Sequence, residues 1–191
     1  MTDGQRGDLI ATMAGAIPSF TFDEAQCIIG NKGPFVAEIR AVFERRKNIY
    51  ASYPAVGEIF ELTLDGGANP PLEMPKRDGY SSEWEHNGPV VTVTQTRSFK
   101  LVQVGYCHNL EEVRKKLAEH GVVPEGQWRE AFRTAYPKID GNGPIGLADP
   151  SWVYPHGYAY FPYVHTVGYP HFSWAGHAFL GHWRWIVAVS E

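Results

Sequence analysis

Tyrosine and histidine are concentrated in one stretch near the C-terminal end of the chain. Residues 154–182 hold five of the ten tyrosines and five of the eight histidines, but no Asn, Asp, Glu, Lys or Arg. A tyrosine ring offers a large rigid surface with one hydroxyl, at a small cost in side-chain entropy. Histidine adds a hydrogen-bond donor and an acceptor, and its charge changes near neutral pH. These residue types favour recognition of a ligand through contact area, with a pH dependence for some ligands.

The spacing of these side chains predicts that they share faces of extended segments. Tyr or His occupies every second position from 154 to 160, and a similar alternation runs from 163 to 171 after a change of phase at Phe161 and Pro162. Alternate residues of an extended chain point to one side. The predicted ligand-binding residues are Tyr154, His156, Tyr158, Tyr160, Tyr163, His165, Tyr169, His171, His177 and His182. The predicted scaffold residues are Trp128, Phe161, Phe172, Trp174, Phe179, Trp183 and Trp185.

The stretch lacks the residue patterns that metal binding, hydrolysis and phosphate binding require. Its five histidines form no HxH or HxxxH pair, and no carboxylate lies between Asp149 and Glu191. A metal site needs a recognisable ligand set, and calcium needs oxygen ligands. Neither a G-x-S-x-G elbow nor a phosphate-binding glycine loop is present. We therefore expect no metal, no cofactor and no enzyme activity.

The elements that lead to this stretch begin with an N-terminal region, residues 1–89, whose role the sequence leaves open. Residues 19–48 predict two helices separated at Gly30 and Gly33, and residues 58–67 predict a strand that ends in a turn. Residues 66–89 are rich in Pro, Gly and charge, which predicts a long loop or linker. A second domain, residues 90–191, is expected to follow.

The second domain is predicted to consist of strands, two helices and an irregular tail. Residues 89–108 alternate between apolar and polar residues, which predicts a hairpin that turns near residues 96–98. Asn109 is expected to cap a helix that ends at Gly121, and residues 122–137 predict a second helix. Only strand and loop signals follow, and they end in a terminal strand, "HWRWIVAVS".

This order of elements is similar to the C-type lectin fold, an α+β fold in which a strand, two helices and a loop-rich antiparallel sheet bring the chain ends together. The segment "GVVPEGQW" resembles the start of the second helix in the formylglycine-generating-enzyme branch of that fold. The resemblance implies a C-type-lectin-like domain over residues 90–191, preceded by a small α/β region. It does not imply that enzyme's activity, because no cysteine follows Cys107.

The bias toward Tyr and His is similar to that of variable proteins diversified by retroelements. In that family, adenine-specific mutagenesis rewrites Asn codons near the C-terminus of a C-type-lectin-like protein, and Tyr and His codons differ from Asn codons only in the first base. The resemblance implies a variable region of about residues 152–185 that binds a macromolecular ligand, expected to be a protein. It also implies that the scaffold residues are the same in all variants, while the Tyr and His positions vary and set the ligand specificity.

Three alternatives stay open at this stage. The segment "CIIGNKGPFVAEI" resembles the KH domain, whose Gly-x-x-Gly loop, here Gly30 to Gly33, clamps a nucleic-acid backbone. The stretch is also compatible with an aromatic carbohydrate- or protein-binding module that is not diversified. Finally, Tyr and His are equally compatible with a partly solvent-exposed sheet face that has only a structural role.

The charge and hydropathy of the chain argue against nucleic acid and membrane as partners. The formal net charge is -4, and Arg184 is the one Lys or Arg residue after Lys138, so nucleic acid is not an expected partner. The apolar segment "LIATMAGAI" is too short for a membrane span and too weakly flanked for a signal peptide. We expect a cytoplasmic protein without a membrane partner. The sequence is compatible with both a monomer and an oligomer.

Overall fold

The computed structural model describes residues 52–80 and 83–189. The chain divides into two compact units, residues 1–45 and residues 46–191, and the described residues all belong to the second. The two helices expected within residues 19–48, together with the Gly30 to Gly33 loop, lie outside the described residues.

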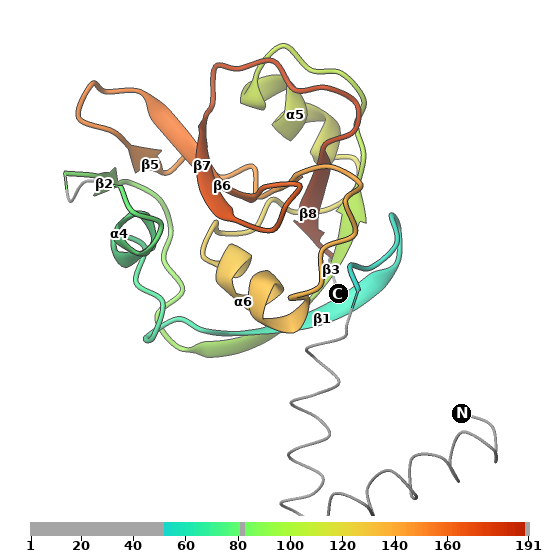
Figure 1. Ribbon diagram of the computed structural model, residues 1–191, viewed down its shortest axis with the longest axis horizontal. Helices are drawn as coiled ribbons and strands as arrows, with labels where there is room; N and C mark the ends of the chain where they lie inside the picture. Colours follow the sequence, from blue (N-terminus) through green and yellow to red (C-terminus); the bar gives the residue numbers. More distant parts are fainter. Residues whose placement is uncertain (1–51, 81–82, 190–191) are drawn as a thin grey trace, which may run out of the picture. The chain divides into compact units, whose positions relative to one another are not determined.

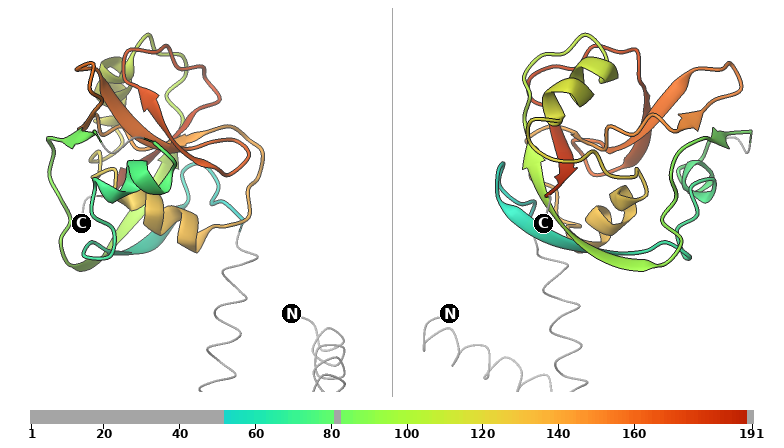
Figure 2. Two further views of the ribbon diagram at one scale, coloured as in Figure 1. Left: turned by 60° about the vertical axis from the view of Figure 1, so that its left-hand side comes forward. Right: turned by 180° about the vertical axis from the view of Figure 1, so that it is seen from behind.

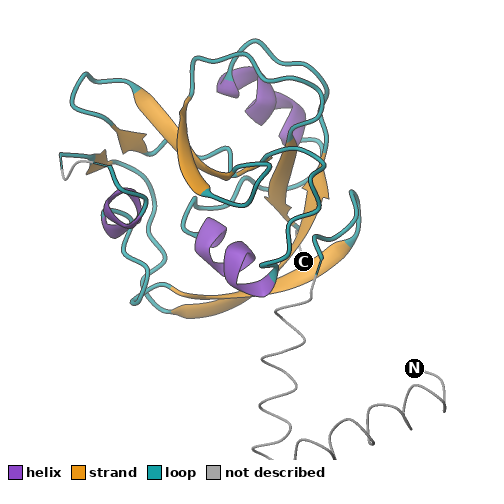
Figure 3. Ribbon diagram, in the orientation of Figure 1, coloured by secondary structure: helices purple, strands orange, loops and turns teal. Residues whose placement is uncertain are grey.

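The second unit is an α+β body built around one mixed sheet (Figures 1 and 3). The sheet has the order β1-β3-β8-β4-β6-β5-β2, and β7 pairs with β6 beside this path. The strands are β1 Ile59–Asp65, β2 Glu85–His86, β3 Thr94–Val102, β4 Ile145–Gly146, β5 Trp152–Val153, β6 Ala159–Val164, β7 Pro170–Trp174 and β8 Arg184–Ala188. The helices are α4 Glu73–Arg77, α5 Leu110–Leu117 and α6 Trp128–Ala135.

Strands β1 and β3 form a long antiparallel ribbon that curves beneath α6 (Figure 1). The apolar residues of β1 alternate strictly, so Phe60, Leu62 and Leu64 are buried on one face. The turn expected near residues 96–98 is wrong, because β3 runs through these positions without a break. Thr96 lies opposite Thr63, and their hydroxyls are hydrogen-bonded at 2.8 Å. The polar residues that imitated a turn therefore belong to a paired strand, in which Thr96 is exposed and the Arg97 guanidinium lies over the Trp128 ring, 5.5 Å from its centroid.

Both expected helices of this unit are present, and they pack on opposite faces of β8 (Figures 1 and 2). Asn109 caps α5 through its side-chain oxygen, which accepts a hydrogen bond of 2.9 Å from the backbone N–H of Glu112. The apolar face of α5 packs against Trp185 and Val187. The apolar face of α6, with Trp128 and Phe132, packs against Ile186 and the β1–β3 ribbon.

The expected terminal strand is β8, which lies between β3 and β4 at the centre of the sheet. All residues from Arg184 to Val187 are buried, so the strand carries apolar residues on both faces. Gly146 of β4 lies under the Trp185 ring, where an added Cβ would come within 2.5 Å of Cζ3. A side chain at position 146 would therefore displace this tryptophan from the core.

The segment 66–89 is part of the folded body and not the linker expected from its composition. It contains α4 and β2, and β2 pairs with β5. Met74 and Trp84 are buried against Trp152 and Phe172 in a third apolar cluster. The boundary expected between residues 89 and 90 is also wrong, because β1 and β3 are paired along their length within the unit 46–191.

In the described part of the chain, no helix is both long enough and apolar enough to cross a membrane. Cys107 is buried with a free thiol.

Candidate functional site

The Tyr- and His-rich stretch folds into two successive hairpins followed by a loop to β8. The first turn is closed by the Gly157 N–H, which donates to the Tyr154 carbonyl at 2.7 Å. In the second turn, the Gly168 N–H donates to the His165 carbonyl at 2.7 Å. Gly157 and Gly168 have φ values of 78° and 89°, which other residues adopt at a steric cost. The extended runs expected over 154–160 and 163–171 are therefore each interrupted by a turn.

The ten predicted ligand-binding residues all reach the surface, but to different extents. Tyr154, Tyr160 and Tyr163 are half-buried. The Tyr163 ring contacts the Trp183 ring at an angle of 44° with centroids 5.2 Å apart, and burial raises the pKa of the Tyr163 hydroxyl. The exposed residues are His156, Tyr158, His165, Tyr169, His171, His177 and His182. Tyr160 and Tyr163 lie on opposite faces of β6, so the candidates form more than one face.

The predicted scaffold residues lie beneath this surface, with one exception. Trp128, Phe161, Phe179 and Trp185 are fully buried, Phe172 is nearly so, and Trp183 is half-buried. Trp174 is the exception, because its side chain is 38% exposed. Its indole ring packs over Gly176, where an added Cβ would come within 2.5 Å of Cζ2. Trp174 therefore belongs to the exposed surface and not to the core.

Trp174 forms one wall of a hollow lined also by Tyr158, Tyr160 and His177, which we call the aromatic hollow. Its volume is about 320 Å³. The Tyr158 ring stands at 71° to the Trp174 ring with centroids 5.6 Å apart, and the His177 ring stands at 75° to it at 5.1 Å. The hollow combines residues of the first turn, both strands of the second hairpin and the loop to β8.

A layer of aromatic side chains supports the aromatic hollow from below. The Trp84 ring contacts the Tyr160 ring with centroids 5.2 Å apart and the Phe172 ring at 5.1 Å. The Tyr80 hydroxyl is hydrogen-bonded to Nδ1 of His171 and accepts a bond of 3.4 Å from the Phe172 N–H. Sequence reasoning missed Tyr80 and Trp84, because both lie in the segment that resembles a linker. A tryptophan within such a segment was the available signal.

A buried ion pair holds the main chain of β7. Arg129 of α6 is fully buried and donates from Nη1 to Oδ2 of Asp78 at 2.6 Å and to the main-chain carbonyl of His171 at 3.1 Å. Its guanidinium lies over the Phe172 ring, 5.0 Å from the centroid. Burial raises the pKa of Asp78, and the charge of Arg129 opposes that rise. The main chain of β7 is thus held by residues outside the stretch.

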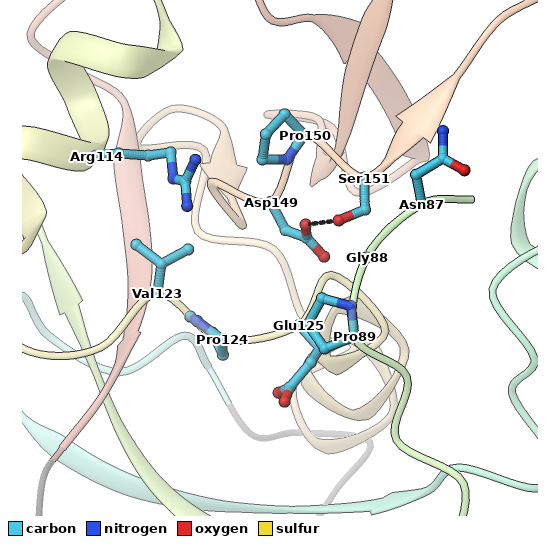
Figure 4. Close-up of a pocket in the computed structure, with 10 residues that line it drawn as sticks. All are labelled: Asn87, Gly88, Pro89, Arg114, Val123, Pro124, Glu125, Asp149, Pro150 and Ser151. Atoms are coloured by element: carbon cyan, nitrogen blue, oxygen red, sulfur yellow. Dashed lines mark hydrogen bonds between the residues drawn. The ribbon is translucent and has the colours of Figure 1, made fainter. Parts of the chain in front are cut away.

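A second, more polar pocket of about 390 Å³ lies between the N-terminal end of α6 and the segment before β5 (Figure 4). Asp149 accepts hydrogen bonds from the Gly126 N–H at 2.7 Å and from the Ser151 hydroxyl. Glu125 pairs with Arg97 at 3.0 Å. Arg114, which has no ion-pair partner among the described residues, reaches the rim (Figure 4). The described residues that line this pocket include Ser151 and two carboxylates, Glu125 and Asp149.

The residues capable of holding a metal are dispersed. Among residues 52–80 and 83–189, no three His, Cys, Asp or Glu side chains are grouped closely enough to hold an ion. Comparison of the chain with protein-family models, curated proteins and solved structures gave no match.

Proposed function

We propose that the chain is a non-enzymatic recognition protein whose Tyr- and His-rich surface binds a protein ligand, and that this surface is diversified between copies of the gene. The observation that supports it most is the separation between exposed and buried positions in residues 154–182. Exposed positions are rich in Tyr and His, whereas Phe161, Phe172 and Phe179 are buried. A change at an exposed position leaves the core unaltered, which is what a variable surface needs.

The order of the strands supports a C-type-lectin-like body. Strand β3 precedes two helices, the irregular hairpins follow, and β8 returns to pair antiparallel with β3. The beginning and the end of this part of the chain therefore meet in adjacent strands. In such a body, the segment between the second helix and the last strand is free to present a surface.

The large exposed side chains of the stretch include tyrosine and tryptophan, which favours a protein ligand over a nucleic acid. Tyr158 is 55% exposed and Tyr169 is 68% exposed. Rigid aromatic side chains supply contact area at low entropic cost in protein-binding loops. Between Lys138 and Arg184 the sequence offers no basic side chain for a phosphate, and Arg184 is buried.

The genetic part of this proposal is tested by sequencing several kilobases of DNA around the gene. A near-copy of the codons for residues 154–182 is expected, and it should differ from the gene only where the copy has adenine, with a reverse-transcriptase gene beside it. The codons of buried Phe161 and Phe172 provide an internal control, since they should be identical in both copies. A flanking region without such a repeat, or a repeat that differs at other bases, contradicts diversification.

The recognition part has its own test. A display library of folded proteins is selected against the chain, and each binder is then tested against a variant with Tyr158, Tyr169 and His156 changed to Ser. Loss of binding by at least about tenfold is expected, because truncating central aromatic residues commonly costs 2 kcal/mol or more. The matched control changes three exposed residues outside the stretch, Lys76, Lys115 and Glu119, to Ser. Binders that are insensitive to the first variant contradict the proposal.

A second candidate is an aromatic binding module that is not diversified. The exposure of Trp174 supports it, because an exposed tryptophan in a hollow is common where a fixed ligand is bound. The two candidates differ in the DNA result, since a fixed module needs no template repeat. The RNA-binding alternative depends on residues 27–39, which lie outside the described residues.

A further inference from the structure

The rings that line the aromatic hollow are steeply inclined to one another and do not form a flat platform. The Tyr158 and His177 rings each stand steeply to the indole of Trp174, at 71° and 75°, and Tyr160 completes the lining. A pyranose ring prefers one broad aromatic face on which to lie. Several ring faces around a small space instead suit a compact group that contacts all of them together.

Among residues 52–80 and 83–189, no lysine or arginine lies over a ring of the aromatic hollow. Among the described residues, the arginines that lie over aromatic rings contact Trp128, Phe172 and Tyr53. Arg184 is directed away from the surface, since its Nη2 donates to Asp140 at 2.8 Å and to the Gly143 carbonyl at 2.9 Å. Because aromatic faces carry negative electrostatic potential, the hollow complements a positive charge supplied from outside.

We propose that the aromatic hollow binds a compact alkylated ammonium group, such as a methylated lysine side chain of a protein ligand. A volume of about 320 Å³ is at the low end for small-molecule pockets, so the hollow accommodates one such group and not a whole ligand. A methylated ammonium is weakly hydrated compared with a plain ammonium, and its methyl groups fill an aromatic enclosure. This assignment deepens the proposed function, because the hollow is part of the Tyr- and His-rich surface.

The test uses choline chloride as the probe and 3,3-dimethylbutan-1-ol as its uncharged isostere. Binding is followed through the indole N–H signals of the six tryptophans in an NMR spectrum of ¹⁵N-labelled protein. Trp174→Phe identifies the Trp174 signal. Choline should shift this signal saturably and bind at least about fivefold more tightly than the isostere, which corresponds to one cation–π contribution at an exposed site. Sodium chloride at equal concentration is the salt control.

Two variants separate charge from shape. His177→Lys places a cation in the hollow while Trp174 and Tyr158 remain, so choline affinity should fall by at least about tenfold while the weak affinity for the isostere is unchanged. Gly176→Ala pushes on the Trp174 ring, and choline affinity should fall without a change in charge. Tyr106→Ala removes an exposed tyrosine that lies outside the Tyr- and His-rich stretch and does not line the hollow, and it should bind choline as the parent does.

Three outcomes overturn the assignment. These are no saturable shift of the Trp174 signal by choline, equal affinity for choline and its isostere, or preferential binding of methyl β-glucoside at the same signal. Each of these leaves the proposed function standing if selected protein binders still depend on the Tyr- and His-rich surface. Conversely, choline binding without any surface-dependent protein binder supports the hollow and contradicts the wider proposal.

Discussion

At the scale of single residues, His86 couples the fold to pH. Its ring contacts Trp152 at 69° with centroids 4.5 Å apart, and its Nε2 is buried without a hydrogen-bond partner in the described part of the chain. Burial lowers the pKa of His86 below its ordinary value of 6.5, against a weaker opposing effect of Asp149. Below pH 6.5 the unfolded chain therefore binds more protons at this residue than the folded chain does.

We expect acid to weaken the fold through His86. The free energy of unfolding should decrease as pH falls from 6.5 toward the lower pKa of the folded state, because protonation then favours the unfolded chain. His86→Phe keeps a ring against Trp152 and should make this decrease smaller. Urea unfolding at pH 7.5, 6.5 and 5.5 measures it, and exposed His120→Phe is the control. A slope that is identical in the parent and His86→Phe rules out the coupling.

The turn glycines allow a matched comparison. Gly157→Ala meets nothing within 4 Å, so its cost is backbone strain alone, about 1 to 2 kcal/mol at a positive φ. Gly168→Ala adds a Cβ that would approach Cγ2 of Ile139 at 2.6 Å, and its cost should be larger. Equilibrium unfolding of both variants measures the difference. Equal costs would mean that the second turn relaxes away from Ile139.

At the scale of elements, β7 is the strand whose position matters most to the surface. Among the described strands it pairs with β6, and side chains from α6 and from the segment after α4 hold its other side. Arg129 is central to this arrangement, because it is buried and contacts Asp78 and the His171 carbonyl. Its buried charge is balanced by two carboxylates, Asp78 at 2.6 Å and Glu130 at 2.6 Å.

We expect Asp78→Ala to destabilise the protein by about 1 to 3 kcal/mol, because it removes one of the two carboxylates that pair with the buried Arg129 and leaves Glu130 as the remaining one. The matched control is Glu73→Ala, which breaks the exposed pair with Lys76 and should cost less than about 1 kcal/mol. Urea unfolding at pH 7 compares them. A similar, small loss in both variants would show that Arg129 finds another partner.

Elements with local signals were predictable, and those decided by distant contacts were not. The Asn109 cap and the apolar spacing around Trp128 and Phe132 identify α5 and α6, because helices begin and pack through neighbours in sequence. The polar run within β3 looked like a turn, since the sequence does not show that strands pair on both of its sides. Burial of Trp84 depends on Phe172, far along the chain.

The candidate site was predicted in its composition but not in its shape. The exposed tyrosines and histidines follow from residue type alone. The turns at Gly157 and Gly168 divide the predicted faces, and the small Gly176 lets the Trp174 ring lie at the surface. Bulky apolar residues are buried so often that sequence reasoning placed Trp174 in the core. Its place was decided by one neighbouring glycine.

At the scale of the whole molecule, β1 belongs to the same core as the last strand. Phe60, Leu62 and Leu64 pack with Ile186 in one cluster. Removing β1 therefore removes three large core side chains, each worth about 2 to 5 kcal/mol, from a protein whose total stability is of the order of 5 to 15 kcal/mol.

We expect a chain of residues 46–191 to fold cooperatively and a chain of residues 90–191 to remain unfolded. Circular dichroism during urea titration distinguishes them, since only the first should show a sigmoidal transition. The control restores residues 46–89 as a separate peptide, which should recover part of the signal of the shorter chain. A cooperative transition of residues 90–191 alone would reinstate the boundary at residue 89.

The stretch between Asp149 and Arg184, which has no acidic side chain and no Lys or Arg, also has a kinetic consequence. Charged surfaces attract their partners from a distance and accelerate encounter, but this stretch contributes no such long-range force. Complexes made through it should form at about 10⁵ to 10⁶ M⁻¹s⁻¹, with little change between low and high salt. Ligands of such a surface differ from one another mainly in how long they stay bound.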